Sequence, residues 1–207
     1  MEPRILKTVE SLKRHGIGCI PVKGEAEAKA KILELIPEGA SVGLGGSMTV
    51  AQTGVVPELE KRGKAFNPYT AEGKIDKTKN QPVIRRDGLT AEYFLTGTNS
   101  ITEDGYLVNT DGTGNRIAAM AYGPKKVILV AGTNKIVKDV PAAFERIKSV
   151  AAPKNARRHG WDDLPCHSGK CADCAAPHRQ CNASLIIHNS REKGRITVIL
   201  IDKELGY

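Results

Sequence analysis

Four cysteines lie close together near the end of the chain, and they are the most specific chemical signal in the sequence. Cys166, Cys171, Cys174 and Cys181 have the spacing C-x4-C-x2-C-x6-C inside a loop, residues 164–182, that contains glycine and proline. Thiolates at such spacing are typical ligands of tetrahedral zinc or of an iron–sulfur cluster. We interpret the four as ligands of a metal centre, with unrelated or redox-active thiols as the alternative.

The gap before Cys181 favours one kind of metal centre. It is longer than the spacing in zinc ribbons, which paired Cys-x-x-Cys knuckles usually build, and so it favours an iron–sulfur cluster of the 4Fe-4S type over zinc. The N-terminal segment has no apolar export signal, so we expect a cytoplasmic protein, whose reducing surroundings disfavour structural disulfides. Residues 164–182 also hold almost no large apolar side chain, so a metal rather than buried surface would order them.

Two glycine-rich turns form a second candidate site. Gly43-Leu44-Gly45-Gly46-Ser47 and Asp111-Gly112-Thr113-Gly114-Asn115 each follow a segment of strand character and precede a helical one. Backbone N–H groups at helix starts bind carboxylates or phosphates, and in a parallel sheet both turns would face one crevice. Neither turn matches a nucleotide-binding fingerprint. The alternative for each is that its glycines only let a helix and a strand pack closely.

A small anionic organic acid, either a 2-hydroxy or a 2-oxo acid, would suit these turns. The candidate substrate-binding residues come from the turns and from two Gly-Thr-Asn repeats: Gly45, Gly46, Ser47, Thr98, Gly112, Thr113, Gly114, Asn115, Arg116 and Asn134. The candidate catalytic residues could move a proton or orient a polar group: Asp111, Asn99, Glu103 and Lys135. Structural roles are the alternative, because Asp111 also suits a helix cap and Arg116 a solvated surface.

Strand-like and helical segments alternate along the chain and would position these residues. Strands are expected at 19–22, 41–46, 64–66, 93–96, 127–131, 184–188 and 195–201. Helices are expected at 4–15, 25–35, 48–62, 81–91, 116–121 and 140–150. Residues 101–109 read as a hairpin that turns at Asp104-Gly105. The pattern predicts a single α/β domain over residues 1–207, Rossmann-like, with a mainly parallel sheet.

Composition narrows the classes of function. The 207 residues carry a formal net charge of +8, but the basic residues are scattered and aromatic residues make up only 4%. No nucleic-acid motif accompanies the charge, so we expect an anionic small ligand or a solvated basic surface, and no nucleic acid. No apolar run approaches the ~18 residues that span a bilayer, so we expect no membrane span.

Several stretches of the sequence resemble one known family. GLGGSMTV, EYFLTGTNSITEDGYLVNTDGTGNRIAAM, GPKKVILVAGTNKIV and the closing PC…GKCADC…RQCN are similar to the LUD-domain family, the lactate-utilisation proteins, in its variant with a C-terminal cysteine cluster. The resemblance implies the fold type of ribose-5-phosphate isomerase, CoA transferases and translation initiation factor 2B subunits. It also implies a part in the oxidation of lactate to pyruvate alongside iron–sulfur partner subunits.

More than one function stays open at this point. The first is an iron–sulfur component of 2-hydroxy-acid oxidation, whose hydride acceptor would reside on a partner chain because the sequence has no flavin or nicotinamide fingerprint. The alternatives are a ligand-binding or regulatory module with a structural zinc, and a CoA transferase-like enzyme. Gly97-Thr98-Asn99 stands where isomerase-like relatives often carry an acidic residue, which disfavours an isomerase. Assembly as a homo-oligomer is open as well.

Overall fold

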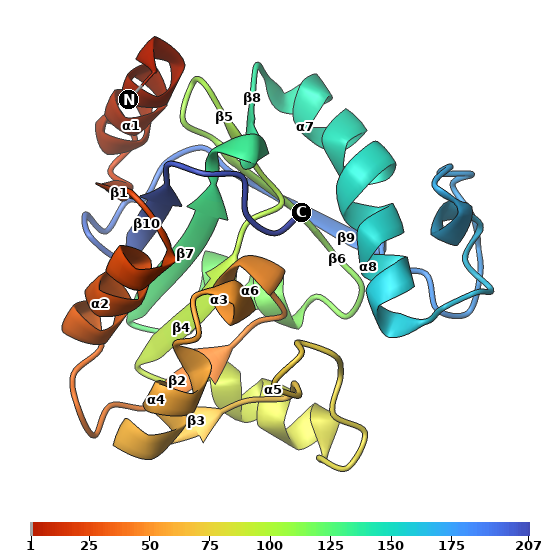
Figure 1. The fold of residues 1–207 in the computed structure, drawn as a ribbon, viewed down its shortest axis with the longest axis horizontal. Coiled ribbons are helices and arrows are strands. Elements are labelled where there is room, and N and C mark those ends of the chain that lie inside the picture. The colour runs from red at the N-terminus through yellow and green to blue at the C-terminus, as the bar shows by residue number, and fades with distance from the viewer. Residues whose placement is uncertain (1) are drawn as a thin grey trace.

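The computed structural model describes residues 2–207 and contains two sheets with helices packed around them (Figure 1). The larger sheet has six strands in the order β1-β10-β7-β4-β2-β3, and every neighbouring pair is parallel. The strands are β1 (Gly18–Val22), β2 (Val42–Leu44), β3 (Ala65–Phe66), β4 (Tyr93–Gly97), β7 (Lys126–Gly132) and β10 (Ile196–Ile201). The expected α/β fold with a mainly parallel sheet is confirmed.

The smaller sheet has the order β8-β5-β6-β9. Its strands are β5 (Ser100–Thr102), β6 (Leu107–Asp111), β8 (Ile136–Val137) and β9 (Ala183–Ile187). β5 and β6 form the expected antiparallel hairpin, and β9 pairs antiparallel with β6. Gly105 in the hairpin turn has φ +90°, and a Cβ there would lie 2.6 Å from the carbonyl carbon of Ser11. The turn therefore needs glycine both for its backbone conformation and for its contact with the first helix.

Eight α-helices lie among the strands along the described chain. They are α1 (Pro3–Arg14), α2 (Glu25–Leu35), α3 (Met48–Gln52), α4 (Val56–Arg62), α5 (Gln81–Leu89), α6 (Asn115–Ala121), α7 (Val140–Arg146) and α8 (Ala152–His159). The single helix expected over residues 48–62 is wrong, because Gly54 adopts a left-handed φ of +65° between α3 and α4. A π-helical segment, Ile147–Ala151, joins α7 to α8, so the helical run extends well past residue 150.

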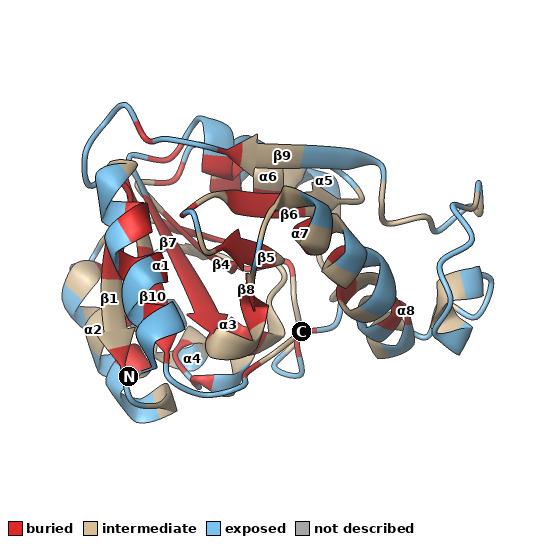
Figure 2. Cartoon of the chain, turned by 90° about the horizontal axis from the view of Figure 1, so that it is seen from above, coloured by how far each residue is buried: buried red, intermediate tan, exposed pale blue. Residues whose placement is uncertain are grey.

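Both faces of the six-stranded sheet are buried, which explains its nearly continuous apolar strands. Along β4, Phe94 packs into the cluster shared with α1 and α6, while Leu95 packs into the opposite cluster with α2, α3 and α4. β7 alternates in the same way, with Leu129 on the first face and Val130 on the second. Figure 2 shows the central strands buried and the outer surfaces of the helices exposed.

No helix among residues 2–207 is long and apolar enough to cross a bilayer.

The central strands should carry much of the folding free energy. Leu129 is fully buried in β7, so Leu129→Ala removes apolar contacts and leaves a cavity, and we expect it to lower the free energy of unfolding by about 2–5 kcal/mol. Leu6→Ala is the matched control, because that leucine is 46% exposed on α1 and should cost less than about 1 kcal/mol. Urea unfolding of the two variants measures both values, and equal losses would contradict this assignment of the core.

Candidate functional site

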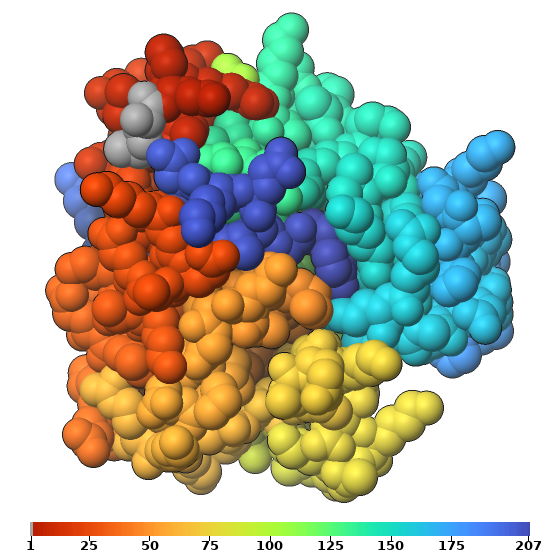
Figure 3. Space-filling model, viewed as in Figure 1, coloured from red at the N-terminus to blue at the C-terminus, as the bar shows by residue number. Residues whose placement is uncertain are grey.

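A polar pocket opens where the two sheets meet, and we call it the polar pocket throughout. Its cavity volume is about 120 Å³, and it lies at the carboxyl ends of β2 and β4, where Ser47 and Gly97 follow their strands. Asp111 at the end of β6 and Lys135 after β7 complete the wall that the sheets provide. In the space-filling view the yellow segment around α5, the cyan α8 and the dark blue C-terminal residues adjoin one another around this region (Figure 3).

The polar pocket brings together most residues singled out in the sequence. Those that line it are Gly46, Ser47, Thr98, Asn99, Asp111, Gly112, Thr113, Asn115, Arg116 and Lys135. The two glycine-rich turns thus border one cavity. Gly45, Gly114, Asn134 and Glu103 are the four candidates outside the lining. Gly45 packs its backbone against Thr96, Gly114 caps α6 with φ +87°, and Asn134 accepts a hydrogen bond from the N–H of Leu205.

Glu103 does not take part in the polar pocket. The structure places it in the hairpin turn beside α1, where its carboxylate pairs with Arg4 at 2.8 Å and Lys7 at 3.3 Å. These two side chains hold the pKa of Glu103 below its usual range. Glu103 therefore lies apart from the other candidate residues, paired with Arg4 and Lys7 of α1. It follows β5 in the sequence, but the hairpin carries it away from the carboxyl ends of the parallel strands.

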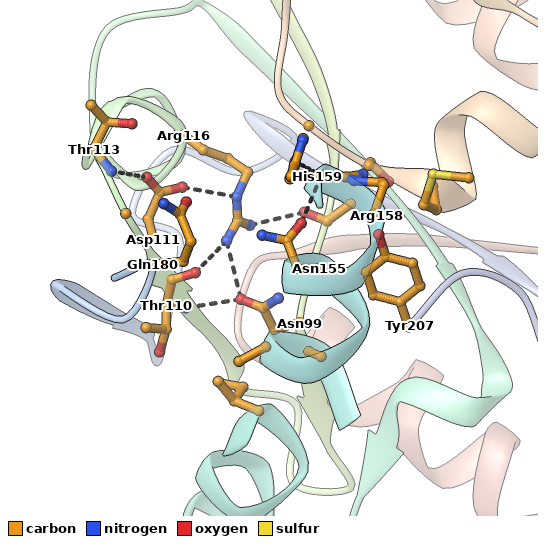
Figure 4. Close-up of a pocket in the computed structure, with 18 of the residues that line it drawn as sticks. Asn99, Thr110, Asp111, Thr113, Arg116, Asn155, Arg158, His159, Gln180 and Tyr207 are labelled. Atoms are coloured by element: carbon orange, nitrogen blue, oxygen red, sulfur yellow. Dashed lines mark hydrogen bonds and ion pairs between the residues drawn. The ribbon is translucent and has the colours of Figure 1, made fainter. Parts of the chain in front are cut away.

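Arg116 is the best-connected side chain of the polar pocket. It is only 7% exposed, and its Nε pairs with Asp111 Oδ2 at 3.1 Å. Its two terminal nitrogens donate to Asn109 Oδ1 and Asn99 Oδ1 and to the carbonyls of Gly97 and Thr110. Figure 4 shows the hydrogen bonds from Arg116 to Asp111, Asn99 and Thr110. Arg116 thus holds the wall of the pocket together through its hydrogen bonds. It is buried, so the alternative of a solvent-exposed arginine is excluded.

The carboxylate of Asp111 also has several hydrogen-bond partners. Besides Arg116, its carboxylate accepts hydrogen bonds from the N–H groups of Thr113 at 3.1 Å and Gly114 at 2.7 Å. Together these donors use both carboxylate oxygens. Asp111 therefore holds the glycine turn and Arg116 in place, which leaves it poorly suited to abstracting a proton from a ligand.

The remaining charges of the polar pocket are positive. Arg85 from α5 and Arg158 from α8 also line the cavity, and Asp111 is the one acidic side chain among the described lining residues. Of the six buried side-chain polar atoms without a partner among residues 2–207, three belong to this lining: Arg85 Nε, Arg158 Nε and the hydroxyl of Tyr207. Buried N–H groups without a partner are costly, so the cavity is suited to an anionic ligand that would satisfy them.

These two arginines and Tyr207 were not found from the sequence. Arg85 lies in a helix whose start is a polar loop, and Arg158 belongs to a basic stretch that resembles a solvated surface. Tyr207 is held over the cavity because Gly206 donates its N–H to Gln52 and accepts from Asn134. No local pattern marks such residues, because they reach the site from segments that are distant in sequence.

Lys135 is the other buried cation of the site. It is 3% exposed, and its Nζ donates a 2.8 Å hydrogen bond to Thr49 Oγ1. Burial and the positive charges of Arg146 and Arg116 together lower the pKa of Lys135 to about 7. A neutral amine is therefore accessible at this position near neutral pH.

An aromatic stack connects the polar pocket with the cysteine loop. The rings of His159 and Trp161, both in the pocket lining, lie 4.4 Å apart, and Trp161 stacks in turn on His178 at 5.9 Å. Burial and the nearby Arg158 lower the pKa of His159 to about 4, so its ring is neutral in the stack. His178 also bonds Asp163 at 2.9 Å. The stack fixes one end of the loop against the rim of the pocket.

The four cysteines of the loop line a single cavity, which we call the cysteine cavity. Its volume is about 190 Å³, and Thr110, Gln180 and Cys181 belong to its wall and to that of the polar pocket. The segment lies on the outer side of α8 and is mostly exposed (Figures 1 and 2). Arg179 holds it by donating to the carbonyls of Cys174 and Cys181 and to Asp173.

The four cysteines have the chemistry that a thiolate-bound metal needs, and they line one cavity. Their side chains are not close enough together to form a ligand group. Burial raises the pKa of Cys181, and the neighbouring Cys171 and Cys166 raise it further, as expected of thiols that approach one another. Among residues 2–207, however, no three His, Cys, Asp or Glu side chains already form a group that could hold a metal ion. Ligation would therefore require the exposed loop to draw its sulfurs together.

The topology and the site at the strand ends define a Rossmann-like α/β protein. The family model described as "LUD domain" matches residues 5–201, so the chain belongs to the LUD domain family.

One solved structure supports the same fold, and others show partial similarity. A DUF162 family protein from Deinococcus radiodurans is similar over 96% of both chains, with 14% sequence identity and a TM-score of 0.55. Partial similarity extends to the delta subunit of eIF2B from Chaetomium thermophilum, with 20% identity over 54% of this chain and 48% of that one and a TM-score of 0.34. A 5-methylthioribose 1-phosphate isomerase from Pyrococcus horikoshii has 13% identity, coverage of 87% and 51%, and a TM-score of 0.35. No curated protein matches the chain.

The pKa of Lys135 predicts a pH-dependent stability. In the unfolded chain the amine keeps its proton up to about pH 10.5, whereas in the folded protein it loses the proton near pH 7. The unfolded state binds more protons between these values, so the free energy of unfolding should rise with pH there. We expect the wild type to gain on the order of 1 kcal/mol per pH unit relative to Lys135→Met. Urea unfolding from neutral to alkaline pH measures the difference, with the exposed Lys193→Met as control. A difference that does not change with pH would show that Lys135 stays charged.

Proposed function

We propose that the chain binds a small organic acid in the polar pocket and takes part in the oxidation of a 2-hydroxy acid, such as lactate, to the 2-oxo acid. The observation that carries this proposal is the shared wall between an arginine-lined pocket and a cavity lined by four cysteines. Membership of the LUD domain family agrees with this assignment.

The charges of the polar pocket support an acid as the ligand. A carboxylate would accept from Arg158 Nε or Arg85 Nε, which have no partner among residues 2–207. Arg85 is held in place by its 3.0 Å bond to Thr113, and Arg158 by its 2.7 Å bond to Asn155. Charge-assisted hydrogen bonds from pre-positioned guanidinium groups are the strong kind, and they give both affinity and orientation.

This source of positive charge differs from the expected one. The helices that follow the two glycine-rich turns are short, and Ser47 itself accepts the N–H of Val50 at the start of α3. The glycines of the two turns instead let other side chains approach the backbone closely. A Cβ on Gly46 would lie 3.0 Å from the ring of Tyr69, and a Cβ on Gly112 would lie 2.5 Å from the side chain of Gln180. They shape the cavity, and the arginines provide its charge.

Cys166, Cys171, Cys174 and Cys181 would hold the metal centre, with an iron–sulfur cluster favoured over zinc because of their spacing. A bound cluster would supply single-electron transfer next to the polar pocket. Arg179 places a positive charge beside the thiolates and bonds the carbonyls of Cys174 and Cys181, which offsets the negative charge of four ligated sulfurs. Oxidation of a 2-hydroxy acid releases two electrons and two protons, so iron–sulfur partner subunits or another acceptor must complete the reaction.

Cys174→Ser should lose the metal and loosen the loop while the folded core persists. Leu164 is the one buried residue of the loop as the structure describes it, so ligation rather than packing must order residues 164–182. We expect anaerobically purified wild type to bind iron and to give an EPR signal upon reduction, and Cys174→Ser to lack both. Trypsin should cleave the variant faster at the exposed Lys170.

Cys19→Ala is the matched control for this experiment. Cys19 is buried in β1, away from the loop, and burial raises the pKa of its thiol to about 12, so it should not act as a metal ligand. The control should keep its iron and its resistance to trypsin. Colourless wild type with one zinc per chain would remove the electron-transfer role and favour the structural zinc. Unchanged protection at Lys170 in metal-free Cys174→Ser would show that packing orders the loop.

Arg85→Gln should weaken acid binding. The substitution removes a charge that faces the cavity, and we expect the dissociation constants for lactate and pyruvate to rise about tenfold. Arg86→Gln is the control. Arg86 follows Arg85 in α5, carries the same charge and is exposed outside the pocket. Isothermal titration calorimetry of wild type and both variants gives the comparison. Equal weakening by both substitutions would point to general electrostatic attraction, and no binding to wild type would refute the small-acid site.

A further inference from the structure

Lys135 lines the polar pocket but has no role in the acid binding proposed above. It follows β7 in a turn of 3₁₀ helix, Thr133–Lys135, and its side chain enters the wall of the cavity beside Ser47 and Gly97. The side chain is 3% exposed and has no carboxylate partner among residues 2–207. A buried lysine without an acidic partner is unusual, because burying its charge without compensation is costly.

The surroundings of Lys135 favour a neutral amine with a free lone pair. Thr49 Oγ1 accepts a 2.8 Å hydrogen bond from Nζ and lies 3.4 Å from the carbonyl oxygen of Leu205, to which it donates its own proton. Only one N–H of Lys135 is engaged in this way, so a neutral amine can keep the bond and still present its lone pair to the cavity. Arg116 and Arg146 are the cations that act on it, and burial with their charges lowers the pKa of Lys135 to about 7. Desolvation together with neighbouring cations is a known means of activating an amine nucleophile.

We propose that Lys135 is an amine nucleophile that forms an imine with a 2-oxo acid held in the polar pocket. This inference rests on the proposed small-acid site. The Nζ lone pair forms a bond to the carbonyl carbon, protons transfer from nitrogen to oxygen, and the carbonyl oxygen leaves as water. No oxidant or reductant is needed, and the step is reversible. The carboxylate of the acid stays on the arginines, which fixes the carbonyl group relative to Lys135.

The imine would give the site a second activity. A protonated imine withdraws electrons from the adjacent carbon, so C–H bonds next to the original carbonyl become acidic and exchange their protons with water. The class of substrate is a 2-oxo acid with such hydrogens, and pyruvate is the smallest example. A 2-hydroxy acid has no carbonyl and cannot form the imine, so the amine distinguishes the oxidised acid from the reduced one.

Borohydride trapping tests the proposal directly. Sodium borohydride delivers hydride to an imine and leaves a stable secondary amine, so wild type incubated with pyruvate should gain one reduced pyruvyl group per chain, located on Lys135 by peptide mapping. Lactate should give no adduct. Lys135→Arg should lose the adduct while the exposed Lys193 stays unmodified in both proteins. In deuterated water, wild type should speed exchange of the pyruvate methyl protons at least about tenfold over Lys135→Arg, as measured by NMR.

Calorimetry on the same samples separates the two proposals. Pyruvate that binds to wild type without an adduct on Lys135 overturns the imine and leaves the small-acid site standing. Adducts confined to exposed lysines overturn it as well. Absence of binding by both acids removes the site and the imine together. An adduct on Lys135 of folded wild type supports the proposal even where the Lys135→Arg variant does not fold, because mapping is done on the unmodified sequence.

Discussion

The buried guanidinium of Arg116 is the interaction on which the rest of the site depends. It is charged and almost without solvent, so it needs an acceptor at every donor, and it finds them in Asp111, two asparagine side chains and two backbone carbonyls. These acceptors come from the end of β4, from the loop that follows it and from β6. Loss of any one would leave a buried donor unpaired at a cost of about 1–3 kcal/mol. The network therefore fixes the large sheet, the small sheet and the glycine turn in one arrangement.

A second arginine, Arg146 of α7, holds the ends of two neighbouring strands. Arg146 donates from Nε to the carbonyl of Asn134 at 3.0 Å and from a terminal nitrogen to the carbonyl of Asn99 at 2.7 Å. Each Gly-Thr-Asn repeat ends a parallel strand, and the two strands are neighbours in the sheet. The repetition thus has a physical reason, since adjacent strands that end in the same way present two carbonyls to one side chain of α7. The charge of Arg146 also lowers the pKa of Lys135, so this arginine influences the chemistry of the cavity as well.

The sequence predicted the framework of the site and not its charge. Strands such as β4 and β7 are apolar because both faces are buried, and Asp104-Gly105 marks a hairpin through local turn chemistry, so both are visible in a short window. Arg85, Arg158 and Tyr207 reach the cavity through packing between segments far apart in the chain, for which no window contains a signal. Glu103 is the opposite case, because it is close to pocket residues in the sequence but not in space. It lies in the turn of the hairpin, where its carboxylate pairs with side chains of α1.

The positive charge of the polar pocket links recognition of an acid to the state of Lys135. Burial and the positive charges of Arg146 and Arg116 raise the cost of a proton on Lys135, which favours the neutral amine. A bound carboxylate offsets part of that repulsion, and the lysine regains affinity for a proton. For a 2-oxo acid the amine can be consumed as an imine, which is itself more easily protonated beside a carboxylate. For a 2-hydroxy acid the proton returns to the amine instead. One arrangement of charges can thus hold both the reduced and the oxidised acid while it treats them differently, as a site working between the two would need.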